Sequence, residues 1–168
     1  MLKTENIRFE PLQTKYLKAL EKLFCESTKV MQSTLKGRVF TKREFEVLLQ
    51  KEFIHSKDDH FGFRCVVSRS DGILMGVSGL HEFNYLGKTY HEFGCILDQE
   101  YWGKGFATEI GIFWFTYAKK QLGLTALVAT VSPSNNASKR VLEKLEMTPL
   151  GKLNSKERGP KLILIKQI

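Results

Sequence analysis

Hydrophobic and polar positions along the first third of the chain follow a strand period and then a helical one. Residues 6–11 alternate and predict a strand, and apolar side chains at helical spacing over residues 16–24 predict a helix. Thr41 and Glu44 have the spacing of a capping box and predict the start of a second helix. The stretch Lys29–Phe40 fits neither period, so we expect a mobile loop there.

The middle of the chain has the period of two that is typical of antiparallel strands. Residues 63–67 alternate, Asp71-Gly72 is a strong hairpin signal, and residues 73–80 predict the partner strand. A turn at 86–88 then leads into another strand at about 89–97. These segments predict hairpin-joined strands.

The helical period returns after Gly105 and predicts an aromatic-faced helix that ends at Gly123. Its apolar face is expected to be core and consists of Phe106, Ile110, Phe113, Tyr117 and, beside them, Trp114. A buried strand at 125–131, a helix capped by Ser134 or Asn135, and two final strands at about 147–153 and 162–167 complete the pattern. The order β-α-α-β-β-β-α-β-α-β-β predicts an α/β fold with a mixed sheet and helices on its faces.

Length and composition narrow the class. The 168 residues, 42% of them hydrophobic, fit one domain over residues 1–168 with a real core. Apolar stretches such as 125–131 and 162–165 are too short to span a membrane, and the first residues lack the apolar core of a secretory signal. Three widely spaced cysteines favour neither a disulfide framework nor a zinc site, so we expect a cytoplasmic protein without a metal.

The net charge of +8 is concentrated in the C-terminal part of the chain. Residues 1–100 contain 15 Lys/Arg and 14 Asp/Glu, whereas residues 101–168 contain 11 and 4. This part is expected to favour an anionic partner, either a phosphorylated small molecule or nucleic acid. A solvated basic face would give the same composition.

The segment from Gly94 to Glu109 predicts a strand, a short loop, a glycine-rich turn and a helix start. A helix N-terminus offers free N–H groups and a partial positive charge, and Gly103 and Gly105 would let an anion approach them, with Lys104 between. The sequence contains no Walker loop, G-x-x-x-x-G-K-S/T. It also lacks the Rossmann G-x-G-x-x-G, because Thr108 stands where that motif has its third glycine. An anion-binding turn and a purely structural glycine turn are the two interpretations.

Two motifs resemble those of the GCN5-related N-acetyltransferases (GNAT). Residues 102–109, WGKGFATE, are similar to motif A of this family, and residues 135–145, NNASKRVLEKL, are similar to a second motif. The motif residues resemble most closely the branch that includes the ribosomal-protein N-terminal acetyltransferases. The two motifs have the order and spacing of the family, and the resemblance runs from about residue 6 onward. It implies the GNAT fold, whose central sheet is mostly antiparallel with helices on both faces. It also implies acetyl-CoA as co-substrate and direct acetyl transfer to a primary amine.

The resemblance also implies which residues bind the donor. Backbone groups of the strand end would pair with the pantetheine arm, which requires this strand to splay from residues 125–131, commonly through a β-bulge. The glycine turn and first helical turn would hold the diphosphate, Asn135 the pantetheine, and Lys139 a phosphate. The implied set is Cys95, Ile96, Leu97, Gly103, Lys104, Gly105, Phe106, Ala107, Thr108, Asn135 and Lys139.

The implied chemistry needs a base for the amine, a donor for the departing thiolate and a donor for the carbonyl oxygen. Glu92 is our candidate base, and a substrate-orienting or surface carboxylate is the alternative. Ser138 is the candidate proton donor or sulfur-orienting group, against a hydroxyl that only bonds the helix backbone. The N–H of Leu97 is the candidate for the oxygen. Cys95 is expected to be an apolar filler rather than a nucleophile.

Other functions remain open from the sequence. The acceptor could be a protein N-terminus, a polyamine or a small aminated metabolite. The basic C-terminal region could instead bind ribosomal or other RNA, although nucleic acid is the less favoured partner. A third alternative is a regulatory protein that binds the coenzyme without turnover. No membrane partner is expected, and either a monomer or a homodimer is compatible with the sequence.

Overall fold

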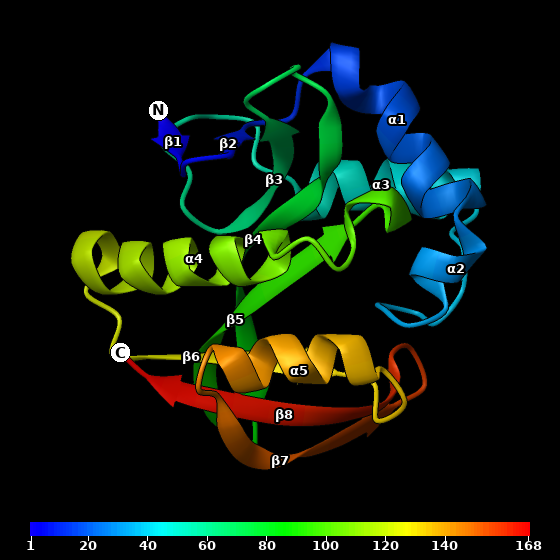
Figure 1. The fold of residues 1–168 in the computed structure, drawn as a ribbon. Helices are drawn as coiled ribbons and strands as arrows, with labels where there is room; N and C mark the ends of the chain where they lie inside the picture. The colour runs from blue at the N-terminus through cyan, green and yellow to red at the C-terminus, as the bar shows by residue number, and fades with distance from the viewer.

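The strand-period segments form one eight-stranded sheet in the computed structural model, which describes residues 1–168 (Figure 1). The spatial order is β1-β2-β3-β4-β5-β6-β8-β7. The strands are β1 (Leu2–Lys3), β2 (Ile7–Glu10), β3 (Gly62–Ser68), β4 (Leu74–Tyr85), β5 (Lys88–Leu97), β6 (Ala126–Val131), β7 (Thr148–Ser155) and β8 (Gly159–Gln167).

Every neighbouring pair in the sheet is antiparallel except β5 and β6. These two strands run parallel and share a single registered pair, Glu92 with Val128, so they separate on the way to Leu97. The separation matches the expectation, but the expected β-bulge in β5 is absent, because its register with β4 is uninterrupted from Lys88 to Leu97. A gap therefore opens at the middle of the sheet.

Helices cover both faces, as the sequence predicts, and they divide the core into two main clusters. On one face lie α4 (Phe106–Leu122) and α5 (Asn136–Lys144), which Figure 1 shows side by side. On the other face lie α1 (Leu17–Glu21), α2 (Thr28–Met31) and α3 (Lys42–Glu52). Short 3-10 turns at Thr14–Tyr16 and Gln99–Tyr101 and a π-helical turn at Lys22–Glu26 complete the helical segments.

Side-chain alternation along β5 and β6 tells which residues face which helices. Phe93 and Leu97 of β5, together with Ala129 and Val131 of β6, pack in the core beneath α4 and α5. Ile96 packs beneath α1–α3 instead. Because successive strand residues point to opposite faces, even-numbered residues of both strands face away from α4 and α5.

The longest helix, α4, is anchored by a buried aromatic side chain. Ile110, Trp114 and Ala118 are fully buried at a spacing of four, whereas the predicted face members Phe113 and Tyr117 are half-buried. The Trp114 indole N–H donates to Ser78 Oγ at 3.0 Å, and this hydroxyl donates to the Gly94 carbonyl at 2.6 Å. The helix is thereby tied to β4 and β5 next to the gap.

The stretch Lys29–Phe40 contains a helical segment and core residues, which the sequence did not predict. It begins inside α2, and it buries Val30, Met31 and Phe40 in the core beneath α1–α3. The apolar positions are too few to show a period, which explains the misreading. The capping box at Thr41 is present as predicted, with Glu44 N–H donating to Thr41 Oγ1. None of the helices has the length and apolar character that a membrane crossing needs.

Candidate active site

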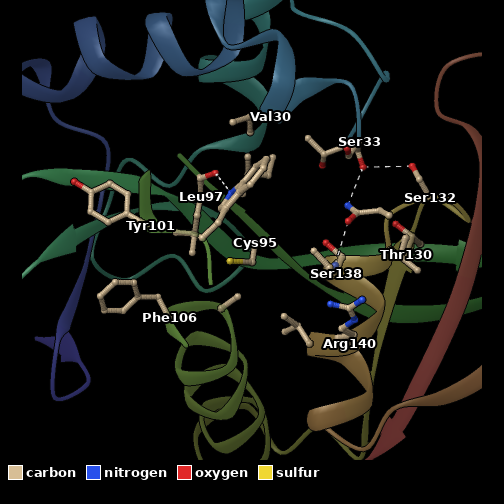
Figure 2. A pocket seen from close by; sticks show the side chains of 18 of the residues that line it. Val30, Ser33, Cys95, Leu97, Tyr101, Phe106, Thr130, Ser132, Ser138 and Arg140 are labelled. Atoms are coloured by element: carbon tan, nitrogen blue, oxygen red, sulfur yellow. Dashed lines mark hydrogen bonds between the residues drawn. The ribbon is translucent and has the colours of Figure 1, made fainter. Parts of the chain in front are cut away.

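A pocket of about 480 Å³ lies where β5 and β6 separate (Figure 2). Its walls come from the end of β5, the start of α4, the end of β6 and α5, and it is closed at one side by the segment that follows α2. The lining reaches residues of both sheet faces, such as Cys95 and Thr130, so the pocket passes through the sheet. This arrangement gives it two ends with different chemistry.

The end beneath α4 is built to accept an anion. The N–H groups of six consecutive residues, 103–108, donate to no acceptor within the protein, and the first helical N–H to do so is that of Glu109. Gly103 and Gly105 have φ of +71° and +85°, the left-handed region that glycine adopts without strain. With the helix dipole, these free donors make a site for a phosphate or diphosphate.

The strand end next to this site is held by a tryptophan. Leu97 closes β5, and its carbonyl oxygen accepts a hydrogen bond from the indole N–H of Trp102 at 2.9 Å, which Figure 2 shows as a dashed line. This bond fixes the loop between β5 and α4. Beyond Glu92 the strand has no registered partner on its β6 side, so this edge is available for an extended ligand.

Asn135 and Ser138 line the pocket at the start of α5. Asn135 is the N-cap of this helix, and its Oδ1 accepts from the Ser138 N–H at 3.1 Å. Its Nδ2 lies 3.5 Å from the carbonyl oxygen of Ser33 in the segment after α2. The Ser138 hydroxyl makes no hydrogen bond with the protein, contrary to the alternative in which it only bonds the backbone, and this leaves it free to act in the pocket.

Most of the predicted donor-binding residues come together around the pocket, and two lie outside it. Lys104 is placed over the Tyr101 ring, 5.9 Å from its centroid. The Lys139 ammonium donates to the Pro133 carbonyl at 2.7 Å. The members that line the pocket are Cys95, Ile96, Leu97, Gly103, Gly105, Phe106, Ala107, Thr108 and Asn135.

Glu92 lies behind the pocket wall and is hydrogen-bonded on one oxygen. Its Oε1 accepts from Thr130 Oγ1 at 2.6 Å and from Arg158 Nη2 at 3.1 Å, while Oε2 has no hydrogen-bond partner. The same Arg158 nitrogen lies 2.7 Å from Thr130 Oγ1. Our prediction did not include this network, because Arg158 is 66 residues away in the chain.

Positive side chains that the sequence analysis did not single out also line the pocket. Arg140 and Lys144 extend from α5, one turn apart, and Lys29 belongs to α2. Arg158 precedes β8 and Lys161 lies within it. The charge excess of residues 101–168 was the available signal, but composition alone did not tell which cations turn inward.

Cys95 is positioned near the middle of the pocket but is not set up as a nucleophile. Burial raises the pKa of its thiol to about 12, although a hydrogen bond with Ser78 works in the opposite direction. The reactive thiolate is therefore nearly absent at neutral pH. This geometry supports the interpretation of Cys95 as an apolar filler.

The opening between the parallel strands β5 and β6, beside the glycine-rich start of α4, agrees with what the motif resemblance implies, and sequence comparison identifies the family. The family description "Acetyltransferase (GNAT) domain" matches residues 6–148. The chain therefore belongs to the GNAT acetyltransferase family, and it is an N-acetyltransferase by family.

Individual relatives are similar at a modest level of identity. An uncharacterized N-acetyltransferase, YnaD of Bacillus subtilis, is 27% identical over 124 residues, which cover 74% of this chain and 69% of that protein. A GNAT-family acetyltransferase structure from Bacillus anthracis matches with a TM-score of 0.78 and 23% identity, covering 99% of this chain and 97% of the other. Spermidine N-acetyltransferase from Vibrio cholerae, solved with CoA and spermine, gives 0.75 and 20%, covering 98% and 96%. These likenesses show the mixed α/β GNAT fold.

Proposed function

We propose that this protein transfers the acetyl group of acetyl-CoA directly to a primary amine, in the cytoplasm and as one domain over residues 1–168. The observation that carries the proposal is the run of unpaired N–H groups from Gly103 to Thr108, which faces the same pocket as the open edge of β5. One end of the pocket thus suits a diphosphate and the adjoining strand edge suits an extended amide-containing arm. The motif resemblance supports the branch that includes the ribosomal-protein N-terminal acetyltransferases, and it leaves the acceptor of this chain open.

The residues that line the pocket have the chemistry that the donor requires. The amides of residues 103–108 would hold the diphosphate, and Arg140 and Lys144 of α5 supply positive charge beside them. Backbone groups of Cys95, Ile96 and Leu97 would pair with the pantetheine amides in the manner of an added strand. Bound there, the coenzyme supplies an activated acetyl thioester.

Glu92 is proposed to take the proton that the acceptor amine must lose. Its Oε1 is held by Thr130 and Arg158, so the carboxylate is fixed in place, while Oε2 is free to accept a proton directly or through water. Glu92 lies an even number of residues from Ile96, so its side chain points to the sheet face opposite to α4. The amine would therefore approach from the face opposite to the phosphates.

Two groups are proposed to stabilise the other charges of the reaction. The N–H of Leu97, at the end of β5, is the donor for the carbonyl oxygen as it becomes negative. The Ser138 hydroxyl, which has no partner within the protein, is the donor toward the departing sulfur. Both line the pocket on the side of α4 and α5.

Calorimetric titration with acetyl-CoA tests the donor site. We expect one-to-one binding at micromolar concentration, and much weaker binding of acetylated pantetheine, which lacks the diphosphate. Absence of acetyl-CoA binding would contradict the proposal. Strong RNA affinity that falls steeply with salt would favour the nucleic-acid alternative instead.

Thiol release in the presence of an amine panel tests turnover. We expect acetyl-CoA consumption that depends on the amine and yields one acetylated product per thiol released. Binding of acetyl-CoA without turnover on any amine would favour a regulatory protein over an enzyme.

A further inference from the structure

The charge of the pocket lining is one-sided. Five cationic side chains line it, namely Lys29, Arg140, Lys144, Arg158 and Lys161, and no aspartate or glutamate does. The proposed base, Glu92, is not among the residues that line the pocket, and its carboxylate is paired with Arg158. Such a lining would repel an acceptor that carries several positive charges.

The cations divide between the two faces of the sheet. Arg140 and Lys144 lie on α5, on the same face as the proposed diphosphate site. Lys161 lies on the opposite face, because it alternates with Leu162, which packs in the core beneath α4 and α5. Arg158 contacts Glu92 and Thr130, whose side chains also point to that opposite face. The coenzyme phosphates on the α4 side therefore do not account for Arg158 and Lys161.

Lys161 is a buried cation without an anion of its own. Its side chain is almost inaccessible, with the residue 5% exposed, and its ammonium donates to the neutral Ser132 hydroxyl at 2.9 Å. No carboxylate pairs with it. Burial, and then the neighbouring Arg158, lower the pKa of Lys161, and the negative charge of Glu92 offsets this only in part.

Arg158 also has donors to spare. Only its Nη2 is engaged, with Glu92 Oε1 and Thr130 Oγ1, and its Nε and Nη1 make no hydrogen bond with the protein. One carboxylate thus faces two cations at this end of the pocket. The unused oxygen of Glu92 lies in the same cluster, so an ammonium site and an anion site are adjacent.

We propose that the acceptor is a small amine that also carries a carboxylate or a phosphate, and that Arg158 and Lys161 hold this anionic group while the amine faces Glu92. The inference rests on the proposed acetyl transfer and names its substrate class. It sets this chain apart from the V. cholerae relative that was solved with spermine, a polyamine. Carboxylate and phosphate share the recognition chemistry, and the substrate panel distinguishes them.

Matched acceptor pairs test the class. The panel contains amino acids with their amides, ethanolamine phosphate with ethanolamine, an amino sugar with its phosphate ester, and spermidine as the cationic amine. Acceptor binding is titrated against protein saturated with CoA, and kcat/KM is measured by thiol release. We expect an anionic member to exceed its neutral partner at least about tenfold in both measurements, with spermidine the poorest substrate.

Lys161→Met tests the assigned cation, because methionine keeps a long apolar side chain in the buried position. We expect the anionic-over-neutral preference to fall about tenfold or more, with the affinity for acetyl-CoA unchanged. Lys144→Met is the matched control on the other face, where acetyl-CoA binding should weaken and the acceptor preference should persist. Arg158→Gln, in the more exposed turn, serves as a second variant if Lys161→Met does not fold.

The outcomes separate this inference from the proposed function. If acetyl-CoA does not bind, the donor site itself is wrong. If acetyl-CoA binds but no anionic member is preferred, if spermidine is preferred, or if no panel member binds, the anionic acceptor class is wrong and the donor site stands. An unchanged preference in folded Lys161→Met and Arg158→Gln proteins would remove these two residues as the anion site.

Discussion

Gly105 offers the sharpest test of the diphosphate site. It is the N-cap of α4 at φ +85°, and a Cβ added there would meet no atom within 4 Å. A side chain therefore fits, and its cost is the left-handed backbone, about 1–2 kcal/mol for an ordinary residue and less for Asn or Asp. Gly105→Asp and Gly105→Asn impose the same backbone demand and nearly the same size, so they differ in charge.

The charge difference sets the expected loss of affinity. Two unit charges roughly 6 Å apart interact by about 0.7 kcal/mol in water and about 3 kcal/mol at an effective dielectric of about 20. In both variants the new side-chain oxygen can accept from the free N–H groups of residues 106–108, so this competition with the ligand is common to the pair and the charge remains the difference. We expect Gly105→Asp to bind acetyl-CoA at least about tenfold more weakly than Gly105→Asn, with a smaller difference at high salt.

The measurement is calorimetric titration of both variants and the parent protein with acetyl-CoA, at low and high salt, with thermal unfolding as the check on folding. Equal affinities of the folded Asp and Asn variants would refute the reasoning, because a carboxylate beside a bound diphosphate must make the binding free energy of acetyl-CoA less favourable. The phosphates would then lie elsewhere in the protein.

Three further predictions address the remaining parts of the site. Glu92→Gln should lower kcat at least about tenfold and leave the affinity for acetyl-CoA unchanged, as steady-state kinetics and titration would show; normal turnover would remove Glu92 from the role of base. Ser78→Ala should lower the free energy of unfolding, measured with urea, by about 1–3 kcal/mol, because the buried Trp114 N–H and the Gly94 carbonyl lose their shared partner. A smaller loss would mean that water replaces the hydroxyl. The Cys95→Ala variant should keep the turnover of the parent protein. Cys95 in the parent should resist alkylation at pH 8, because a thiol with a pKa of about 12 becomes a thiolate only as the pH approaches that value. Rapid alkylation at Cys95, or loss of turnover in the variant, would contradict this.

The donor end of the site could be predicted because its signals are local in sequence. Gly103 and Gly105 precede a helix that the apolar period shows clearly, and a helix N-terminus has free N–H groups wherever it occurs. Asn135 could be predicted as one of two N-caps for the same reason, since a cap acts on residues two or three positions later.

The acceptor end could not be predicted because its contacts join distant segments. Lys156–Arg158 has the composition of a solvated turn, and nothing near it in sequence indicates that Arg158 reaches Glu92. Lys139 has the better motif position for a phosphate, yet it bonds Pro133, while Arg140 and Lys144 line the pocket. Which face of a short helix turns inward depends on the neighbouring elements.

Apart from β1 and α2, which were not predicted, the sequence by itself determined the order of the main elements, the two-sided sheet and the anion-binding start of α4, since periodicity, caps and glycines act over a few residues. Only the tertiary structure decided that β5 and β6 separate without a bulge, that Glu92 shares its oxygen with Thr130 and Arg158, and that Lys161 is buried without a carboxylate. These features depend on which strands become neighbours and on how far apart they lie, and long-range packing sets both.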